Sequence, residues 1–135
     1  MIINSTIEKD LNKLAITGDD FLIKIRLMEL RHLALNSSNS LFIFEFINTF
    51  PEFANAIRTG FADFNSMDLK FCALLKLGFS TVEIANITNS SMRAAESRKY
   101  RIRKRLGLET PSDLYEFMGT LGQDSMHIRN SANVA

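Results

Sequence analysis

The chain has 135 residues, 46% of them hydrophobic, and carries 16 basic against 15 acidic side chains. This length suits one domain or a small domain with an extension, and eleven phenylalanines without a low-complexity tract exclude a disordered chain. Because no run of roughly 18 uncharged apolar residues and no secretion-signal pattern is present, we expect neither a membrane partner nor export.

The cysteine content indicates the redox state of the compartment in which the protein functions. Cys72 is the only cysteine, so no disulfide can form within the chain, which favours a reducing, cytoplasmic setting. It stands in the apolar run LKFCALLKL, where we expect a buried side chain rather than a reactive thiol.

Helical spacing of apolar residues, with only two prolines and six glycines, predicts an all-α fold. In the first half we expect helices at four places: Ser5 or Thr6 to about Ala15, Asp19 to about Leu35, Leu41 to Ile47, and Pro51 to about Thr59 with Gly60 as a left-handed cap. Residues 36–40 form the clearest linker. The composition of residues 41–47 also allows a strand, but no partner strand is visible. The helix from Asp19 is apolar on nearly every side, so it needs burial by the rest of the chain or by a second copy.

Capping signals divide the second half of the chain into four further helices. The expected bounds are Asn65 or Ser66 to a stop at Gly78, Thr81 to Ile87 after the Ser80 and Glu83 capping box, Ser90 or Ser91 to about Leu106 with a stop at Gly107, and a last helix from Pro111. The tight turn is residues 88–90.

Excess positive charge is concentrated in one of these helices. Residues 91–108 hold seven basic side chains against Glu96 alone, a balance of +6 in a chain whose total is +1. Residues 1–90 and 109–135 are acidic, at −2 and −3. Such an asymmetry indicates a polyanionic partner for one face of the molecule.

Rotation by 100° per residue separates two sides of the basic helix. The packing side consists of Ala95, Ile102 and Leu106 with the stem of Lys99, and the outward side of Arg93, Ser97, Tyr100 and Lys104, with Arg101 and Arg103 at its flanks. A helix in a DNA major groove needs this arrangement, because directional donors read base edges and marginal charges contact phosphates. The helix starts at Ser80 and Ser91 offer backbone N–H groups to phosphates as well.

Two signatures flank the turn at a fixed separation. Ser80, Glu83, Ile84 and Ala85 precede it, and the basic helix ends in residues 105–108 (RLGL). This pattern resembles the LuxR-type (GerE-like) helix-turn-helix of bacterial transcription regulators over about 29 residues. Residues 99–104 (KYRIRK) and 50–53 (FPEF) resemble a C-terminal effector domain variety of that family, which extends the likeness to roughly residues 41–118.

The resemblance implies base reading by Glu96, Ser97 and Tyr100, and phosphate or edge contacts by Arg93, Arg98, Arg101 and Lys104. With the residues taken from rotation and capping, the predicted DNA-contact set is Ser80, Thr81, Ser91, Arg93, Glu96, Ser97, Arg98, Tyr100, Arg101, Arg103 and Lys104. It also implies that the helix from Pro111 is a brace and a dimer surface, with Tyr115, Phe117, Met118 and Leu121 available. The chain departs from the family at Thr88 and Ser90, where Leu and Ile are usual, and at Ala94-Ala95, which shrinks the apolar anchor of the basic helix.

These patterns predict a dimeric transcription regulator that binds double-stranded DNA. Residues 1–60 would dimerise or dock on a partner, residues 61–121 would bind DNA, and residues 122–135 would form a flexible tail. RNA polymerase or a separate sensor protein are further expected partners. The alternative is a protein-interaction module whose basic helix docks on an acidic partner such as RNA polymerase or another regulator; Glu96 on the outward side and the polar turn favour it.

Catalysis has no support in the sequence. His32 and His127 are isolated, no carboxylate cluster or Gly-rich phosphate loop is present, and nothing has metal-ligand spacing. We therefore expect no enzyme activity, cofactor or metal.

Overall fold

The computed structural model describes residues 18–122, and within this range the regular structure is entirely helical. Its helices are α2 (Gly18–Asn36), α3 (Asn39–Thr49), α4 (Pro51–Gly60), α5 (Ser66–Lys76), α6 (Thr81–Ile87), α7 (Met92–Leu106) and α8 (Pro111–Thr120). The predicted all-α class is confirmed, including the helix over residues 41–47. The helix predicted over residues 5–15 lies outside the described residues, as does all but Gly122 of the predicted tail.

Side-chain caps fix where these helices begin. Asn65 and Asp68 form a reciprocal capping box, in which the Asp68 N–H donates to Asn65 Oδ1 (2.8 Å) and the Asn65 N–H to Asp68 Oδ2 (3.0 Å). The predicted caps at Ser80 and Ser91 are confirmed. Ser38, one of the linker serines that could cap the next helix, caps α3. The structure adds a box of Thr110 with Asp113 before α8, which the sequence patterns did not single out. Each such cap contributes about 1 kcal/mol to helix stability.

Helix ends follow the predicted glycines with one exception. Gly78 and Gly107 have φ angles of 83° and 74°, the left-handed conformation expected after α5 and α7. The prediction for Gly60 is wrong, because Gly60 is the last residue of α4 and has no positive φ. Phe61 closes that helix at φ −136°, and its N–H donates to the Ile57 carbonyl. The linker is also shorter than predicted, since Ser37 and Ser38 alone separate α2 from α3.

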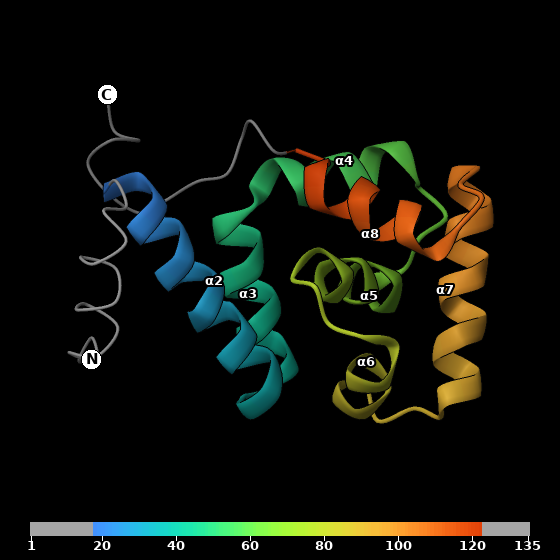
Figure 1. Ribbon diagram of the computed structural model, residues 1–135, viewed down its shortest axis with the longest axis horizontal. Coiled ribbons are helices and arrows are strands. Elements are labelled where there is room, and N and C mark those ends of the chain that lie inside the picture. Colours follow the sequence, from blue (N-terminus) through green and yellow to red (C-terminus); the bar gives the residue numbers. More distant parts are fainter. Residues whose placement is uncertain (1–17, 123–135) are drawn as a thin grey trace.

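Helix α5 lies at the centre of the fold, with α6, α7 and α8 around it and the α2–α3 hairpin on the far side from α7 (Figure 1). Its residues 71–75 are all buried. Cys72 among them is fully buried, as predicted, and burial raises the pKa of its thiol to about 12. The described helices include none that is long and apolar enough to cross a lipid bilayer.

Aromatic rings fill the corner between α3 and α4. The centroids of Phe46 and Phe50 are 5.1 Å apart, and Phe53 meets Phe46 edge-on at 5.6 Å. Phe42 stands 5.9 Å from Phe46 on the other side. Rings at these separations attract each other beyond the area they bury. The FPEF segment thus supplies core side chains and the Pro51 that begins α4.

Helix α2 is fastened to both halves of the described chain. Arg26 donates to Thr49 Oγ1 (2.7 Å) and to the Glu45 carboxylate (2.6 Å) on α3. Arg31 donates to the Leu77 carbonyl after α5. One core cluster extends from Leu30 through α3–α7 to Met118. The division of the chain after residue 60 stays a prediction.

Candidate nucleic-acid interface

Helix α7 forms one end of the molecule in the described chain, with the other helices packed against a single side of it (Figure 1). Ala95 and Ile102 are almost fully buried and Leu106 is half-buried, so the predicted packing side is confirmed. Contacts from α6 and α8 hold this side of the helix. The position of α7 is therefore set by apolar packing, which leaves its charged side to solvent.

The opposite side of α7 carries an exposed, mostly basic surface, which we call the basic face: Arg93, Ser97, Tyr100, Arg101 and Lys104. Glu96 is exposed beside it. Tyr100 is 55% exposed and has cations near its ring, with the Arg103 guanidinium 5.3 Å and the Lys104 ammonium 5.8 Å from the centroid. The outward side predicted by rotation is confirmed as exposed.

One predicted contact residue is instead committed to the fold. Arg98 is half-buried and forms an ion pair with Asp68 of α5, whose residue exposure is 7%. Arg101 Nη2 lies 3.6 Å from the same carboxylate, but its side chain remains 61% exposed. Sequence did not identify Asp68 as a partner of Arg98, because this pair joins residues 30 positions apart. Its capping box with Asn65 spans three residues, so that role had a local signal that was missed. The ion pair between Arg98 and Asp68 holds α7 against α5.

Two further cations of α7 have hydrogen-bond partners outside the basic face. Arg103 donates to the carbonyls of Leu108 (3.0 Å) and Glu109 (2.7 Å), closing the turn after the helix. Arg105 binds both carboxylate oxygens of Asp63, and this hydrogen bonding holds the pKa of Asp63 below its usual range. Of the seven cations in residues 91–108, those left on the basic face are Arg93, Arg101 and Lys104.

Lys99 also turns inward, as the sequence predicted for its stem. Its ammonium donates to Thr81 Oγ1 (2.9 Å) and lies 5.0 Å from the ring centroid of Tyr115. Burial lowers the pKa of Lys99. Thr81, a predicted DNA contact, is therefore a partner of α7 within the fold.

The two predicted helix starts differ in what they offer an anion. At α6 the Glu83 carboxylate accepts from the Ser80 N–H (2.8 Å), a bond that lowers the pKa of Glu83 and occupies this helix end. Helix α7 has no acidic residue in its first turn, and its cap Ser91 is exposed. The start of α7 thus keeps the positive end of its helix dipole uncompensated by a carboxylate.

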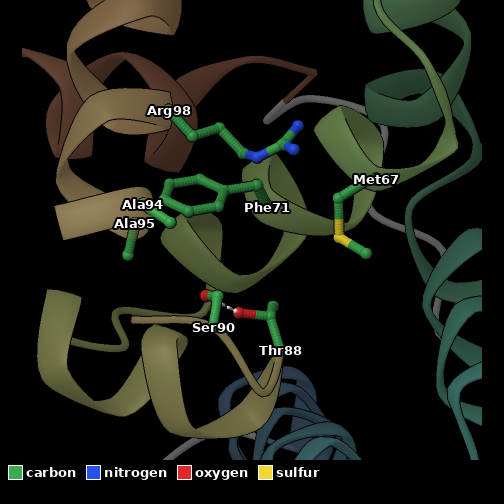
Figure 2. Close-up of a pocket in the computed structure, with 7 residues that line it drawn as sticks. All are labelled: Met67, Phe71, Thr88, Ser90, Ala94, Ala95 and Arg98. Carbon is green, nitrogen blue, oxygen red and sulfur yellow. Dashed lines mark hydrogen bonds between the residues drawn. The ribbon is translucent and has the colours of Figure 1, made fainter. Parts of the chain in front are cut away.

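A small pocket of about 120 Å³ opens beside the turn between α6 and α7 (Figure 2). Its lining residues are Met67, Phe71, Thr88, Ser90, Ala94, Ala95 and Arg98. Four of them are the positions at which the chain departs from the LuxR-type pattern. The Thr88 and Ser90 hydroxyls hydrogen-bond each other at 2.8 Å instead of filling the space. The pocket thus lies where the sequence predicted a smaller apolar anchor for the basic helix.

Comparisons with known proteins found no matching family model, no matching curated protein and no matching solved structure. Within residues 18–122, no three His, Cys, Asp or Glu side chains are grouped as a metal site would require. The basic face is therefore the feature of the described chain that indicates a ligand.

Proposed function

We propose that this protein is a sequence-specific DNA-binding transcription regulator that acts as a homodimer and places α7 in the major groove. The observation that carries the proposal is the division of α7 into a buried apolar side and the exposed basic face. An α-helix fits the major groove, which alone displays a distinct donor and acceptor pattern for each base pair.

The basic face supplies each kind of contact that such a helix needs. Ser97 and Tyr100 lie along its middle, where a hydroxyl can donate to or accept from base edges. Arg93, Arg101 and Lys104 lie around them and contact phosphates. Arg98, Arg103 and Arg105 contribute by fixing the helix, through Asp68, the turn carbonyls and Asp63, respectively.

In a twofold dimer, two copies of α7 contact half-sites separated by one helical turn of DNA, about 34 Å, or by a whole number of turns. The proposal therefore includes a near-palindromic operator. Selection of bound fragments from genomic DNA tests this part, because a dimer enriches inverted repeats with that spacing. Enrichment of no common sequence contradicts sequence-specific binding.

Salt dependence tests the proposal quantitatively. Each phosphate contact contributes about −0.9 to the slope of log affinity against log salt, so three contacts per copy give a slope of about −5 for a dimer. Fluorescence anisotropy of a labelled duplex between about 50 and 300 mM salt measures it. No binding at the lowest salt contradicts the proposal. That result, together with saturable binding of an acidic partner to α7, supports the alternative of a protein-docking helix.

A further inference from the structure

Helix α2 leaves an apolar surface exposed on the side opposite the core. Leu30 is fully buried against the rest of the chain, whereas Met28 and Leu35 are 47% and 57% exposed. Rotation by 100° per residue places both of these on the side away from Leu30, together with Phe21. Exposed large apolar side chains gathered on one surface mark interaction sites.

The spacing on this outer side is that of a coiled coil. Phe21, Ile25, Met28, His32 and Leu35 follow one another at intervals of four, three, four and three residues. This is the alternation of the a and d positions in a heptad, the pattern with which one helix packs along another. We call these five residues the α2 seam; Met28, His32 and Leu35 are exposed, and Phe21 and Ile25 are half-buried. His32 occupies an a position, where a polar residue specifies register at a cost in stability.

We propose that the α2 seam is a parallel, twofold dimer interface with the α2 seam of a second copy of this chain. The inference specifies the homodimer contained in the proposed function, yet its tests use no DNA, so the two can fail separately. A second copy suits the seam because it presents the same heptad spacing, which is self-complementary about a twofold axis.

Charges beside the seam select the orientation. Lys24 and Glu29 flank it on opposite sides, five residues apart, at the g and e positions of the heptad, and both are exposed. In a parallel pair, Lys24 of one copy faces the partner subunit's Glu29. An antiparallel pair centred on Met28 brings Glu29 beside the partner subunit's Glu29, which repels it. Among residues 18–122 of one copy, Glu29 pairs with Arg26, at 3.0 Å along the same helix.

Helix α8, the dimer surface implied by the family resemblance, exposes less apolar surface than α2. Its Leu114 and Met118 are fully buried, and Tyr115, Phe117 and Leu121 are half-buried against the core. The expectation that Met118 is available to a partner is therefore wrong. Its burial, and contacts of α8 with α5 and α7, fit the predicted brace. Helix α3, by contrast, adds Leu41 and Phe44 to the exposed apolar surface of the α2–α3 hairpin, at 43% and 60% exposure.

The first test is the mass of the full chain in solution by light scattering. We expect about twice 15.3 kDa for the wild type at tens of micromolar. The Met28→Glu/Leu35→Glu variant is expected to give a single copy with unchanged helicity, because both side chains are exposed within one copy. Val82→Glu on α6 is the matched control, since Val82 is 55% exposed and lies off the seam. Its mass should match that of the wild type.

The second test reports orientation. Leu35→Cys is expected to form a disulfide between copies under mild oxidation, because a parallel twofold pair brings position 35 beside its equivalent. An antiparallel pair places position 35 beside position 21 and gives no such bond. Val82→Cys is the control that should remain uncrosslinked, and the buried Cys72 does not compete.

Three results would overturn the inference. A wild-type mass of one copy at 100 µM removes the dimer. A double variant that remains dimeric places the interface elsewhere. A double variant that unfolds more easily while the wild type is a single copy shows that another part of the same chain covers the seam.

A third test exchanges the charges beside the seam. Lys24→Glu alone should weaken dimerisation by roughly tenfold, and Lys24→Glu/Glu29→Lys should restore it.

Discussion

Helices α2 and α7 lie on opposite sides of the folded molecule within the described residues (Figure 1). One exposes an apolar surface and the other a basic surface. Both bury an apolar stripe, with Leu30 in α2 and Ile102 in α7 fully inside. On their outer sides α2 presents methionine and leucine, whereas α7 presents arginine, lysine and tyrosine. Burial of an apolar outer side against protein lowers the free energy because it removes apolar surface from water. Binding of a cationic outer side to a polyanion lowers the free energy because counterions are released from the polyanion.

The cations of α7 therefore fall into two groups, those that have partners inside the fold and those that remain exposed to a ligand. Asp68 and Asp63 pair with Arg98 and Arg105, and backbone carbonyls engage Arg103. These cations hold the end of the molecule together, and only some of the positive charge remains for a ligand. On α2, Arg26 pairs with Glu29 of the same helix and with Glu45 of α3, whereas the side chains of Met28 and Leu35 remain exposed.

The largest expected effect concerns the basic face. Arg101→Ala with Lys104→Ala should lower the affinity of the dimer for duplex DNA roughly 10³-fold at 0.1 M salt and flatten its salt slope by about 3.6, because two phosphate contacts are lost in each copy. Anisotropy measures both quantities. Arg58→Ala on α4 is the matched control, an exposed cation away from α7. Equal losses in the control would mean that binding depends on total charge and not on the basic face. The mass of the double variant should match that of the wild type.

Removal of Asp68 tests how α7 is held. Asp68→Ala leaves the half-buried Arg98 unpaired and removes a helix cap, so the free energy of unfolding should fall by about 2–3 kcal/mol. Asp63→Ala is the matched comparison, since its partner Arg105 is on the same helix but the pair is exposed. Urea unfolding should show a much smaller change there. Similar losses in both variants would contradict the structural role given to Asp68.

Filling the pocket is expected to stabilise the α7 end by about 1 kcal/mol. Thr88→Leu with Ser90→Ile places apolar groups in the space of about 120 Å³ beside Phe71 and Ala95. The midpoint of urea unfolding should rise, while Thr59→Leu on the exposed side of α4 should not raise it. A lower midpoint for the double variant would show that the turn cannot accommodate the larger side chains.

The smallest expected effect is a dependence of the unfolding free energy on pH, which arises at Lys76 of α5. Burial lowers the pKa of Lys76 to about 8, and its ammonium donates to the carbonyls of Met118 (3.2 Å) and Gly119 (3.0 Å). From pH 8 toward 10.5 the unfolded chain keeps a proton on this lysine that the folded chain has released, so stability rises with pH in that window. The unfolding free energy of the wild type minus that of Lys76→Met should therefore increase from pH 8 to 10. A flat or falling difference would contradict the assignment.

Local signals in the sequence predicted most of the helices. Ser80 with Glu83, and Gly107 after the basic helix, act within a few residues, so their effect is readable from spacing alone. The Gly60 prediction failed because the ending of α4 depends on Phe61, whose ring packs on Phe64 (5.3 Å between centroids) and lies below the Arg105 guanidinium. That arrangement joins residues more than 40 positions apart and leaves no local pattern.

The candidate interface was predictable in part for the same reason. Helical rotation separated Tyr100 from Ile102 correctly, because it follows from backbone geometry. It did not reveal that Arg98 and Thr81 are used inside the fold, since their partners Asp68 and Lys99 come from other helices. The DNA contacts themselves stay predictions.

The most direct measurement is a two-dimensional amide NMR spectrum of the full chain titrated with a duplex obtained by fragment selection. The account predicts that the largest shifts fall on residues 91–104 of α7 and its preceding turn, with α2 little affected. Shifts concentrated on α2 or α3, or no shifts at low salt, would contradict the assignment of the basic face as the DNA-binding surface.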